Sequence, residues 1–250
     1  KKDIKFDNSN LLLTVITFNN IDILRKQYEY LKKYLETPYD YLVADNSNLT
    51  SKSIEIERFC HENNLSYVKI PNNPLTGIRA SGSHGIALNW VYRNIIQKYR
   101  PKYFGFLDHD IFPIKQVSIL DKLNLGFYGV VRKRKEPYWY MWPGFSFYEY
   151  EMIKNYKCDF SPYHAGADGF TFLDTGGSNY NSIYKHIGKI GVREAKSILI
   201  NSVTGEEFVK GEDSSRTFEI IEDTWLHLRQ IAWRAESSEK MNNLEELIHI

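Results

Sequence analysis

The first half of the chain alternates apolar runs with amphipathic stretches. Residues 11–18 form a continuous apolar, β-branched run, which is typical of a strand buried on both faces of a parallel sheet. From Ile21 to Leu35 apolar residues recur at helical spacing, and Pro38 is expected to end that helix. The same criteria predict strands over 41–44, 65–70 and 103–107 and helices over 51–63 and 83–99. Strands that alternate with helices predict an α/β fold with a mainly parallel sheet flanked by helices.

The pattern changes after about Pro113. Residues 127–132 and 138–142 predict two strands around the basic turn Arg132–Lys135, followed by Pro143, Gly144 and another short apolar piece. The sequence contains no internal repeat, low-complexity tract or linker. We therefore expect one domain over residues 1–250, in which the second half extends the same sheet.

Composition and charge narrow the function classes. With 42% hydrophobic and 25% charged residues the chain is expected to fold around a core, and 32 basic against 31 acidic residues provide no general field that would attract nucleic acid. Cys60 and Cys158 form neither a disulfide framework nor a metal-ligand spacing, which favours a reducing compartment such as the cytoplasm. Peripheral attachment of the protein to a membrane is left open. No apolar run reaches the roughly 20 residues that span a bilayer, so no integral membrane segment is expected.

Asp108 and Asp110 carry the strongest chemical signal, because they follow directly on the strand predicted over 103–107. Carboxylates at this edge of a sheet suit Mg²⁺ or Mn²⁺, which complete their coordination with substrate phosphates. His109 between them is expected to point away from the metal if the local backbone is extended. A solvated turn is the alternative interpretation.

The order of these features resembles the A-type glycosyltransferase fold, GT-A, and most of all its family 2 members, over residues 11 to about 180. The segment 17–20 matches the tail of the first strand, 45–47 matches the end of the second, and Asp108 and Asp110 match the Asp-x-Asp metal motif. The resemblance implies that the donor nucleotide is bound by Thr17, Asn19, Asp45, Asn46, Ser47 and Asp108. It also implies that Asp110 is the main metal ligand, that residues 11–112 bind the nucleotide sugar, and that residues 113–250 serve the acceptor.

Three further positions match the family in part. Arg79 precedes a Ser- and Gly-rich loop and could add charge for a diphosphate, while Ser81 or Ser83 could instead cap the helix that follows. Asp174, with Asp168 as the substitute, lies where inverting members place the catalytic base, although a plain turn fits equally well. His227 is similar to the C-terminal histidine that supplies a third metal ligand, and a structural role is its alternative.

The sequence therefore predicts a Mn²⁺- or Mg²⁺-dependent glycosyltransferase that moves a sugar from a nucleotide-diphosphate sugar, with UDP favoured, to a hydroxyl of a glycan or other acceptor, with inversion. A sugar nucleotidyltransferase is one alternative, disfavoured because no Gly-rich, Lys-bearing loop follows the first strand. A noncatalytic sugar- or nucleotide-binding module is the other.

Overall fold

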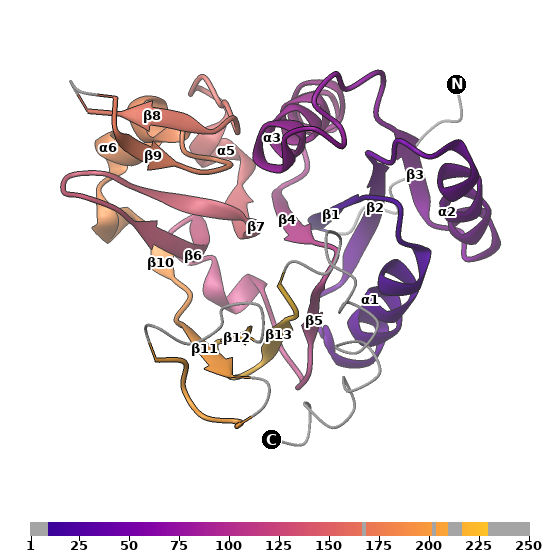
Figure 1. Ribbon diagram of the computed structural model, residues 1–250. Helices are drawn as coiled ribbons and strands as arrows, with labels where there is room; N and C mark the ends of the chain where they lie inside the picture. The colour runs from indigo at the N-terminus through magenta and orange to yellow at the C-terminus, as the bar shows by residue number, and fades with distance from the viewer. Residues whose placement is uncertain (1–9, 167–168, 202–203, 210–216, 230–250) are drawn as a thin grey trace.

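A computed structural model describes residues 10–166, 169–201, 204–209 and 217–229 of the chain (Figure 1). Its central feature is a seven-stranded sheet with the strand order β10-β6-β7-β4-β1-β2-β3. Four neighbouring strands of this sheet pair in parallel: β1 (Leu11–Thr17), β2 (Tyr39–Asp45), β3 (Ser66–Lys69) and β4 (Tyr103–Asp108). All seven residues of β1 are buried, as the continuous apolar run predicts.

Helices cover both faces of the parallel strands, because alternate residues of β1 point to opposite faces. Leu11, Leu13 and Val15 pack with the apolar faces of α1 (Ile21–Tyr34) and α2 (Thr50–Glu62). Leu12 and Ile16 pack on the other face with α3 (Ala80–Val91). A π-turn, η1 (Tyr92–Ile96), and α4 (Gln97–Tyr99) continue α3, so the predicted helix over 83–99 is confirmed but begins three residues earlier.

The second half of the chain extends this sheet, as predicted. Strands β6 (Phe127–Lys133), β7 (Trp139–Glu149) and β10 (Arg193–Glu194) continue it beyond β4, and β7 runs antiparallel to both β4 and β6. The strand predicted over 138–142 is longer than expected, since β7 continues through Pro143 and Gly144 to Glu149. The pairing of β7 with β6 is irregular in this region, where its register shifts between Gly129 and Val131 of β6.

A second, four-stranded sheet has the order β11-β12-β13-β5. It consists of β11 (Ser197–Asn201), β12 (Thr217–Ile221), β13 (Trp225–His227) and β5 (Ile111–Pro113). Because β5 follows immediately on the acidic turn at 108–110 and pairs with β13, Ile111 lies opposite His227. Arg229 lies two residues after the end of β13.

Short elements complete the described part of the chain: η2 (Leu120–Lys122), α5 (Tyr150–Ile153), β8 (Tyr163–Ala165), β9 (Thr171–Leu173), η3 (Tyr180–Tyr184), α6 (Lys185–Ile187) and η4 (Lys189–Gly191). β8 and β9 pair as a separate antiparallel hairpin. Cys60 and Cys158 are both buried free thiols. Among the described residues, no helix combines the length and the apolar character that crossing a bilayer requires.

Candidate functional site

The backbone of the acidic turn between β4 and β5 accepts hydrogen bonds from a buried glutamine. Gln27 of α1 is 0% exposed, and its Nε2 donates to the carbonyl oxygens of Asp108 at 2.7 Å and Ile111 at 2.8 Å. The Tyr41 hydroxyl donates to the remaining Gln27 oxygen at 2.7 Å. These bonds fix the backbone on both sides of the turn. Residues 109 and 110 form a turn and not an extended strand. The condition under which His109 was expected to point away from the metal, an extended backbone, is therefore not met.

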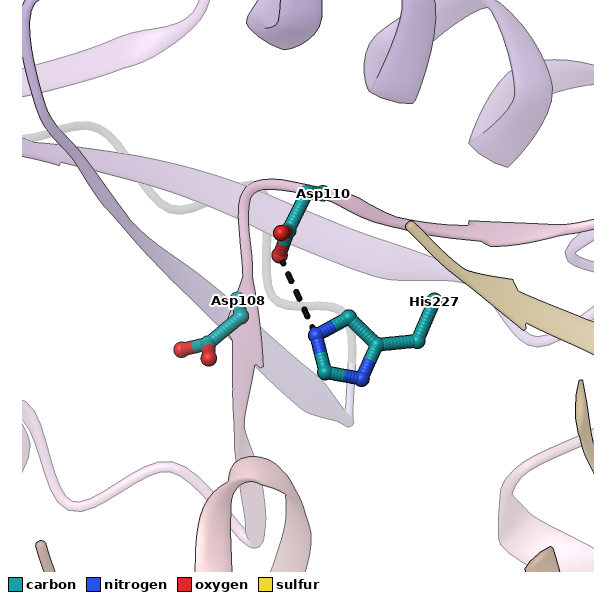
Figure 2. Close-up of side chains that lie close together, drawn as sticks. All are labelled: Asp108, Asp110 and His227. Atoms are coloured by element: carbon teal, nitrogen blue, oxygen red, sulfur yellow. Dashed lines mark ion pairs between the residues drawn. The ribbon is translucent and has the colours of Figure 1, made fainter. Parts of the chain in front are cut away.

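Three side chains lie close together at this turn: Asp108, Asp110 and His227 (Figure 2). Each offers one ligand atom, and these atoms all lie within 4.8 Å of one another. The Nε2 atom of His227 is 3.6 Å from a carboxylate oxygen of Asp110. The pairing of β13 with β5 brings these positions together, although 117 residues of sequence separate Asp110 from His227.

The other nitrogen of the His227 ring is bound by a buried carboxylate. Nδ1 lies 3.0 Å from Oε2 of Glu219, a residue of β12 that is 1% exposed. Arg132 of β6 donates two hydrogen bonds to Glu219, at 2.8 and 2.9 Å. Burial alone would raise the pKa of Glu219, but hydrogen bonds from His227 and Arg132 outweigh it and hold that pKa well below its usual range.

Aromatic contacts complete this support. The Arg132 guanidinium lies 4.8 Å from the centre of the Trp142 ring, and the Trp142 ring lies 5.0 Å from that of His227. Arg132 therefore contacts both groups that flank the histidine. Through the Arg132 to Glu219 pair the seven-stranded sheet is joined to the sheet that carries His227.

The donor chemistry of the cluster fits a hard divalent cation. If Nδ1 of His227 donates its hydrogen to Glu219, Nε2 presents a lone pair toward the two carboxylates, so that three acceptors face one another. Burial and the nearby charge of Asp110 raise the pKa of Asp108, although His84, whose Nε2 lies 3.5 Å from Asp108 Oδ1, acts in the opposite direction. Crowded acceptors of this kind are stabilised by a bound cation, and carboxylate and imidazole ligands suit Mn²⁺ or Mg²⁺.

The cluster lies in a pocket of about 540 Å³ that opens at the carboxyl ends of the parallel strands. Five of the residues predicted from sequence line it: Asn46, Asp108, Asp110, Asp174 and His227. Thr17, Asn19, Asp45, Ser47 and Arg79 are not among its lining residues, and Asp168 lies outside the described residues. The remaining lining residues are Ile16, Phe18, Ala80, Ser81, Ser83, His84, His109, Arg132, Arg134, Tyr140, Trp142, Thr175, Leu199, Glu219 and Arg229.

Asp45 is satisfied inside the protein. It is 0% exposed, and its oxygens accept from the Ser47 amide at 2.8 Å, the Tyr67 hydroxyl at 2.9 Å and Lys69 Nζ at 3.2 Å. Burial raises its pKa, but the hydrogen bonds from Ser47 and the charge of Lys69 lower it further than burial raises it. In this arrangement Asp45 shapes the loop after β2, and its predicted contact with a nucleotide remains a prediction.

The neighbours of Asp45 divide between loop and pocket. Ser47 accepts a hydrogen bond from the backbone of Asn19 at 2.8 Å, and Asn19 takes a left-handed backbone with φ of 51°. Thr17 is 0% exposed and Arg79 is exposed. Asn46 reaches the pocket and donates to Ser83 Oγ at 2.9 Å.

The first turn of α3 forms one wall of the pocket. Ala80, Ser81, Ser83 and His84 all line it. The prediction that Ser81 or Ser83 caps this helix was wrong, because both lie inside α3, whose N-cap residue is Arg79 without a side-chain cap hydrogen bond. The N–H groups of a first helical turn have no partner within the helix, so this wall suits an anionic ligand.

Asp174 lies in a turn directly after β9 and also lines the pocket. Its Oδ1 accepts from the Thr175 amide at 2.7 Å, and the Thr175 hydroxyl donates to the Ser81 carbonyl of α3 at 3.1 Å. The Gly176 amide donates to the Phe160 carbonyl at 2.7 Å. Asp174 thus belongs to a turn and also lines the pocket, so the two interpretations of this residue are compatible.

Two parts of this site were not predicted from the sequence. One is the ion pair of Glu219 with Arg132, and the other is Gln27. Arg132 appeared only as part of a basic turn, and nothing in the sequence distinguishes Glu219 from other strand residues. Its position opposite His227 depends on the β12–β13 pairing, in which Glu219 and His227 are partners. Alternating burial across β12 would have been the only available signal, and that strand is five residues long.

Comparison with known proteins gives a partial structural likeness. No family model matches the chain, and no curated protein matches its sequence. Solved structures similar to it include the mannosyltransferase PcManGT from Pyrobaculum calidifontis in complex with GDP-Man and Mn²⁺, at 12% identity and a TM-score of 0.40 over 59% of this chain and 46% of that one. Another is S. aureus TarS in complex with UDP-GlcNAc, at 14% identity and a TM-score of 0.38 over 58% and 46% of the two chains.

The mannosyltransferase Ktr4p from S. cerevisiae is also similar, at 7% identity and a TM-score of 0.42 over 61% of this chain and 59% of that one. The match thus spans less than two thirds of each of these proteins. Their TM-scores all lie below 0.5, so the likeness is partial. We therefore base the function on the site.

Proposed function

We propose that the chain is a metal-dependent glycosyltransferase that transfers a sugar from a nucleotide-diphosphate sugar to a hydroxyl acceptor. The observation that carries this proposal is the cluster of Asp108, Asp110 and His227 in a pocket beside the first turn of α3. Cation ligands and the N–H groups of the first turn of a helix, lining one pocket, together suit a diphosphate.

The donor side of the pocket is formed by the ends of the parallel strands. Asp108, Asp110 and His227 would hold Mn²⁺ or Mg²⁺, which would neutralise negative charge that develops on the leaving diphosphate. The N–H groups of the first turn of α3 bind the phosphate oxygens. Asn46 and Phe18 line the pocket after β2 and β1, and in this proposal they contact the nucleoside, with UDP as the favoured class.

The acceptor side is formed by β7 and the turn after β9, where Asp174, Tyr140 and Trp142 line the pocket. Asp174 removes the proton from the acceptor hydroxyl as that oxygen forms its bond to the anomeric carbon of the sugar. The bond from the anomeric carbon to the phosphate oxygen breaks, and its electron pair leaves with the nucleoside diphosphate. Displacement in one step inverts the anomeric configuration.

A thermal-shift experiment tests the donor site. UDP, GDP, CDP and dTDP are each added with Mn²⁺, with Mg²⁺ or with EDTA, since a ligand that binds the native state at 100 times its Kd stabilises it by about 2.7 kcal/mol. We expect UDP to stabilise the protein only when a metal is present, and Asp110→Asn to abolish that shift. Asp121→Asn, an exposed acid outside the pocket, is the matched control.

Two results would contradict the proposal. If no nucleoside diphosphate stabilises the protein under any metal condition, the pocket is not a donor site. If stabilisation is the same in EDTA and in Asp110→Asn, the three-residue cluster does not hold the metal that the proposal requires. Stabilisation that is present without any sugar transfer would favour the noncatalytic binding module.

A further inference from the structure

Three segments far apart in the sequence meet at one end of the molecule, which we call the basic end: residues 132–136, 170–172 and 185–194. In Figure 1 this end carries the tip of the β6–β7 hairpin, the β8–β9 hairpin and α6. Arg134 Nε donates to the Phe172 carbonyl at 3.3 Å, and Lys189 Nζ lies 3.0 Å from Glu136 Oε1. The same hairpin therefore contacts both other segments.

Positive charge is concentrated at the basic end, although the net charge of the whole chain is close to zero. Residues 132–136 and 185–194 hold seven basic and two acidic side chains, whereas the whole chain has 32 and 31. Both acids are paired, Glu136 with Lys189 and Glu194 with Lys133, and the charge of Arg132 is balanced by Glu219 outside these segments. Lys135 and Lys185 are exposed, and no ion pair forms at either within the part of the chain that the structure describes. A local field at this end is thus superimposed on a nearly neutral molecule.

Large apolar side chains project beside these cations. Ile190 is 90% exposed, Phe170 is 85% exposed and Phe172 is 40% exposed. Single exposed apolar residues are ordinary on protein surfaces. Here, however, Ile190 follows Lys189 directly, and Phe172 contributes the carbonyl that binds Arg134. Basic side chains and exposed phenylalanine and isoleucine on neighbouring segments match the polar and apolar layers of a bilayer interface.

We propose that the basic end docks on an anionic lipid surface. Lysine and arginine side chains would meet the headgroups, while Phe170 and Ile190 enter the boundary between headgroups and acyl chains. A soluble polyanion would account for the charges but leave the two exposed apolar side chains without a role. An anionic membrane accounts for both.

The position of the basic end relative to the pocket gives the docking a consequence. Arg134 lines the pocket as well as belonging to the basic end, and β9 leads directly into the turn that carries Asp174. Docking therefore presents the acceptor side of the pocket to the lipid surface, so that the acceptor hydroxyl belongs to a membrane-borne molecule. This consequence rests on the proposed function, whereas the docking itself does not.

Vesicle co-sedimentation tests the docking with the full chain. Phosphatidylcholine vesicles are compared with phosphatidylcholine vesicles that contain phosphatidylglycerol, at low and high salt. We expect binding only to the anionic vesicles, and we expect Lys135→Glu combined with Lys185→Glu to weaken it by at least about tenfold, because each basic residue near such a surface contributes about 1 kcal/mol. The matched control, Lys98→Glu with Lys115→Glu, changes the charge equally at exposed sites elsewhere and is expected to bind as the unaltered protein does.

A second pair of variants tests the apolar part. Phe170→Ser with Ile190→Ser keeps every charge, and we expect it to weaken vesicle binding by about tenfold or more while leaving the salt dependence intact. Equal weakening by both lysine pairs would overturn the docking surface. Binding to dextran sulfate with none to anionic vesicles would also overturn it and assign the charges to a polyanion. Metal-dependent stabilisation by nucleotides is measured on every variant, so failure of the docking and failure of the donor site are distinguished.

Discussion

Replacing Glu219 with glutamine isolates the group that orients His227. The side chain keeps its size, but the negative charge that accepts from Arg132 and His227 is lost. Carboxylates that orient a metal-binding histidine typically contribute 10- to 100-fold in metal affinity, so we expect Mn²⁺ to bind Glu219→Gln about 10 to 100 times more weakly.

The same substitution should lower the stability of the metal-free protein. Removing one partner of a buried ion pair costs about 3–5 kcal/mol, and we expect the lower end because Arg132 is 29% exposed and glutamine can still accept one hydrogen bond. A loss of about 3 kcal/mol corresponds to a fall in Tm of roughly 6–12 °C for a chain of this size. Most of that loss reflects an Arg132 charge left without its partner.

Two assays separate these effects. Urea unfolding without metal gives the change in the free energy of unfolding, and titration calorimetry with Mn²⁺ well below the Tm of the variant gives the affinity of the folded protein. The control is Glu222→Gln, which makes the same chemical change at a partly exposed acid paired with Lys122 at 3.4 Å. We expect it to cost less than about 1 kcal/mol and to leave Mn²⁺ affinity unchanged. Unchanged Mn²⁺ affinity in Glu219→Gln would refute the role assigned to Glu219.

Three further substitutions test other parts of the structure. Asp174→Asn should reduce sugar transfer by at least about 100-fold while nucleotide binding persists, as steady-state kinetics and the thermal shift would show, and weakened nucleotide binding would make Asp174 a donor-site residue instead. Asp45→Asn should cost about 1.5–3 kcal/mol at pH 7. Because the folded-state pKa of Asp45 is lowered, its contribution to stability is complete above the unfolded pKa near about 4 and is lost as pH falls through the folded value. The free energies of unfolding of wild type and variant should therefore converge in acid. A difference in stability that persists there would contradict the assignment. Gly85→Ala should lower the Tm, since a Cβ at Gly85 would lie 2.9 Å from the Phe160 carbonyl oxygen, and an unchanged Tm would show that the 160–161 loop yields readily.

The first half of the fold could be predicted because three of its strands, β1, β2 and β4, are largely buried on both faces. A run such as residues 11–17 contains no charged residue and only two polar ones, both threonine, and helices of 13 and 14 residues repeat their apolar positions often enough to be recognised. The second sheet gave no such signal. β5 and β13 have three residues each, too few to establish a period, and their pairing joins positions more than 100 residues apart.

The candidate site divides in the same way. Asp108 and Asp110 could be proposed from their place after a buried strand, and His227 only from its resemblance to a family position. Asp45 was placed correctly at the end of its strand, but the sequence does not show that Tyr67 and Lys69 on the neighbouring strand satisfy its carboxylate. Whether a polar side chain faces a ligand or a neighbour depends on cross-strand pairs that local patterns do not specify.

The release of nucleoside diphosphate from sugar nucleotides tests the central claim most directly. UDP- and GDP-linked sugars are incubated with the protein and Mn²⁺, with and without a mixture of hydroxyl acceptors, and the free diphosphate is measured. We predict release that requires metal, is lost in EDTA and falls to background in Asp110→Asn. Release that is unchanged in EDTA and in Asp110→Asn, or absent with every donor, would contradict the assignment of this pocket as the site of a metal-dependent glycosyltransferase.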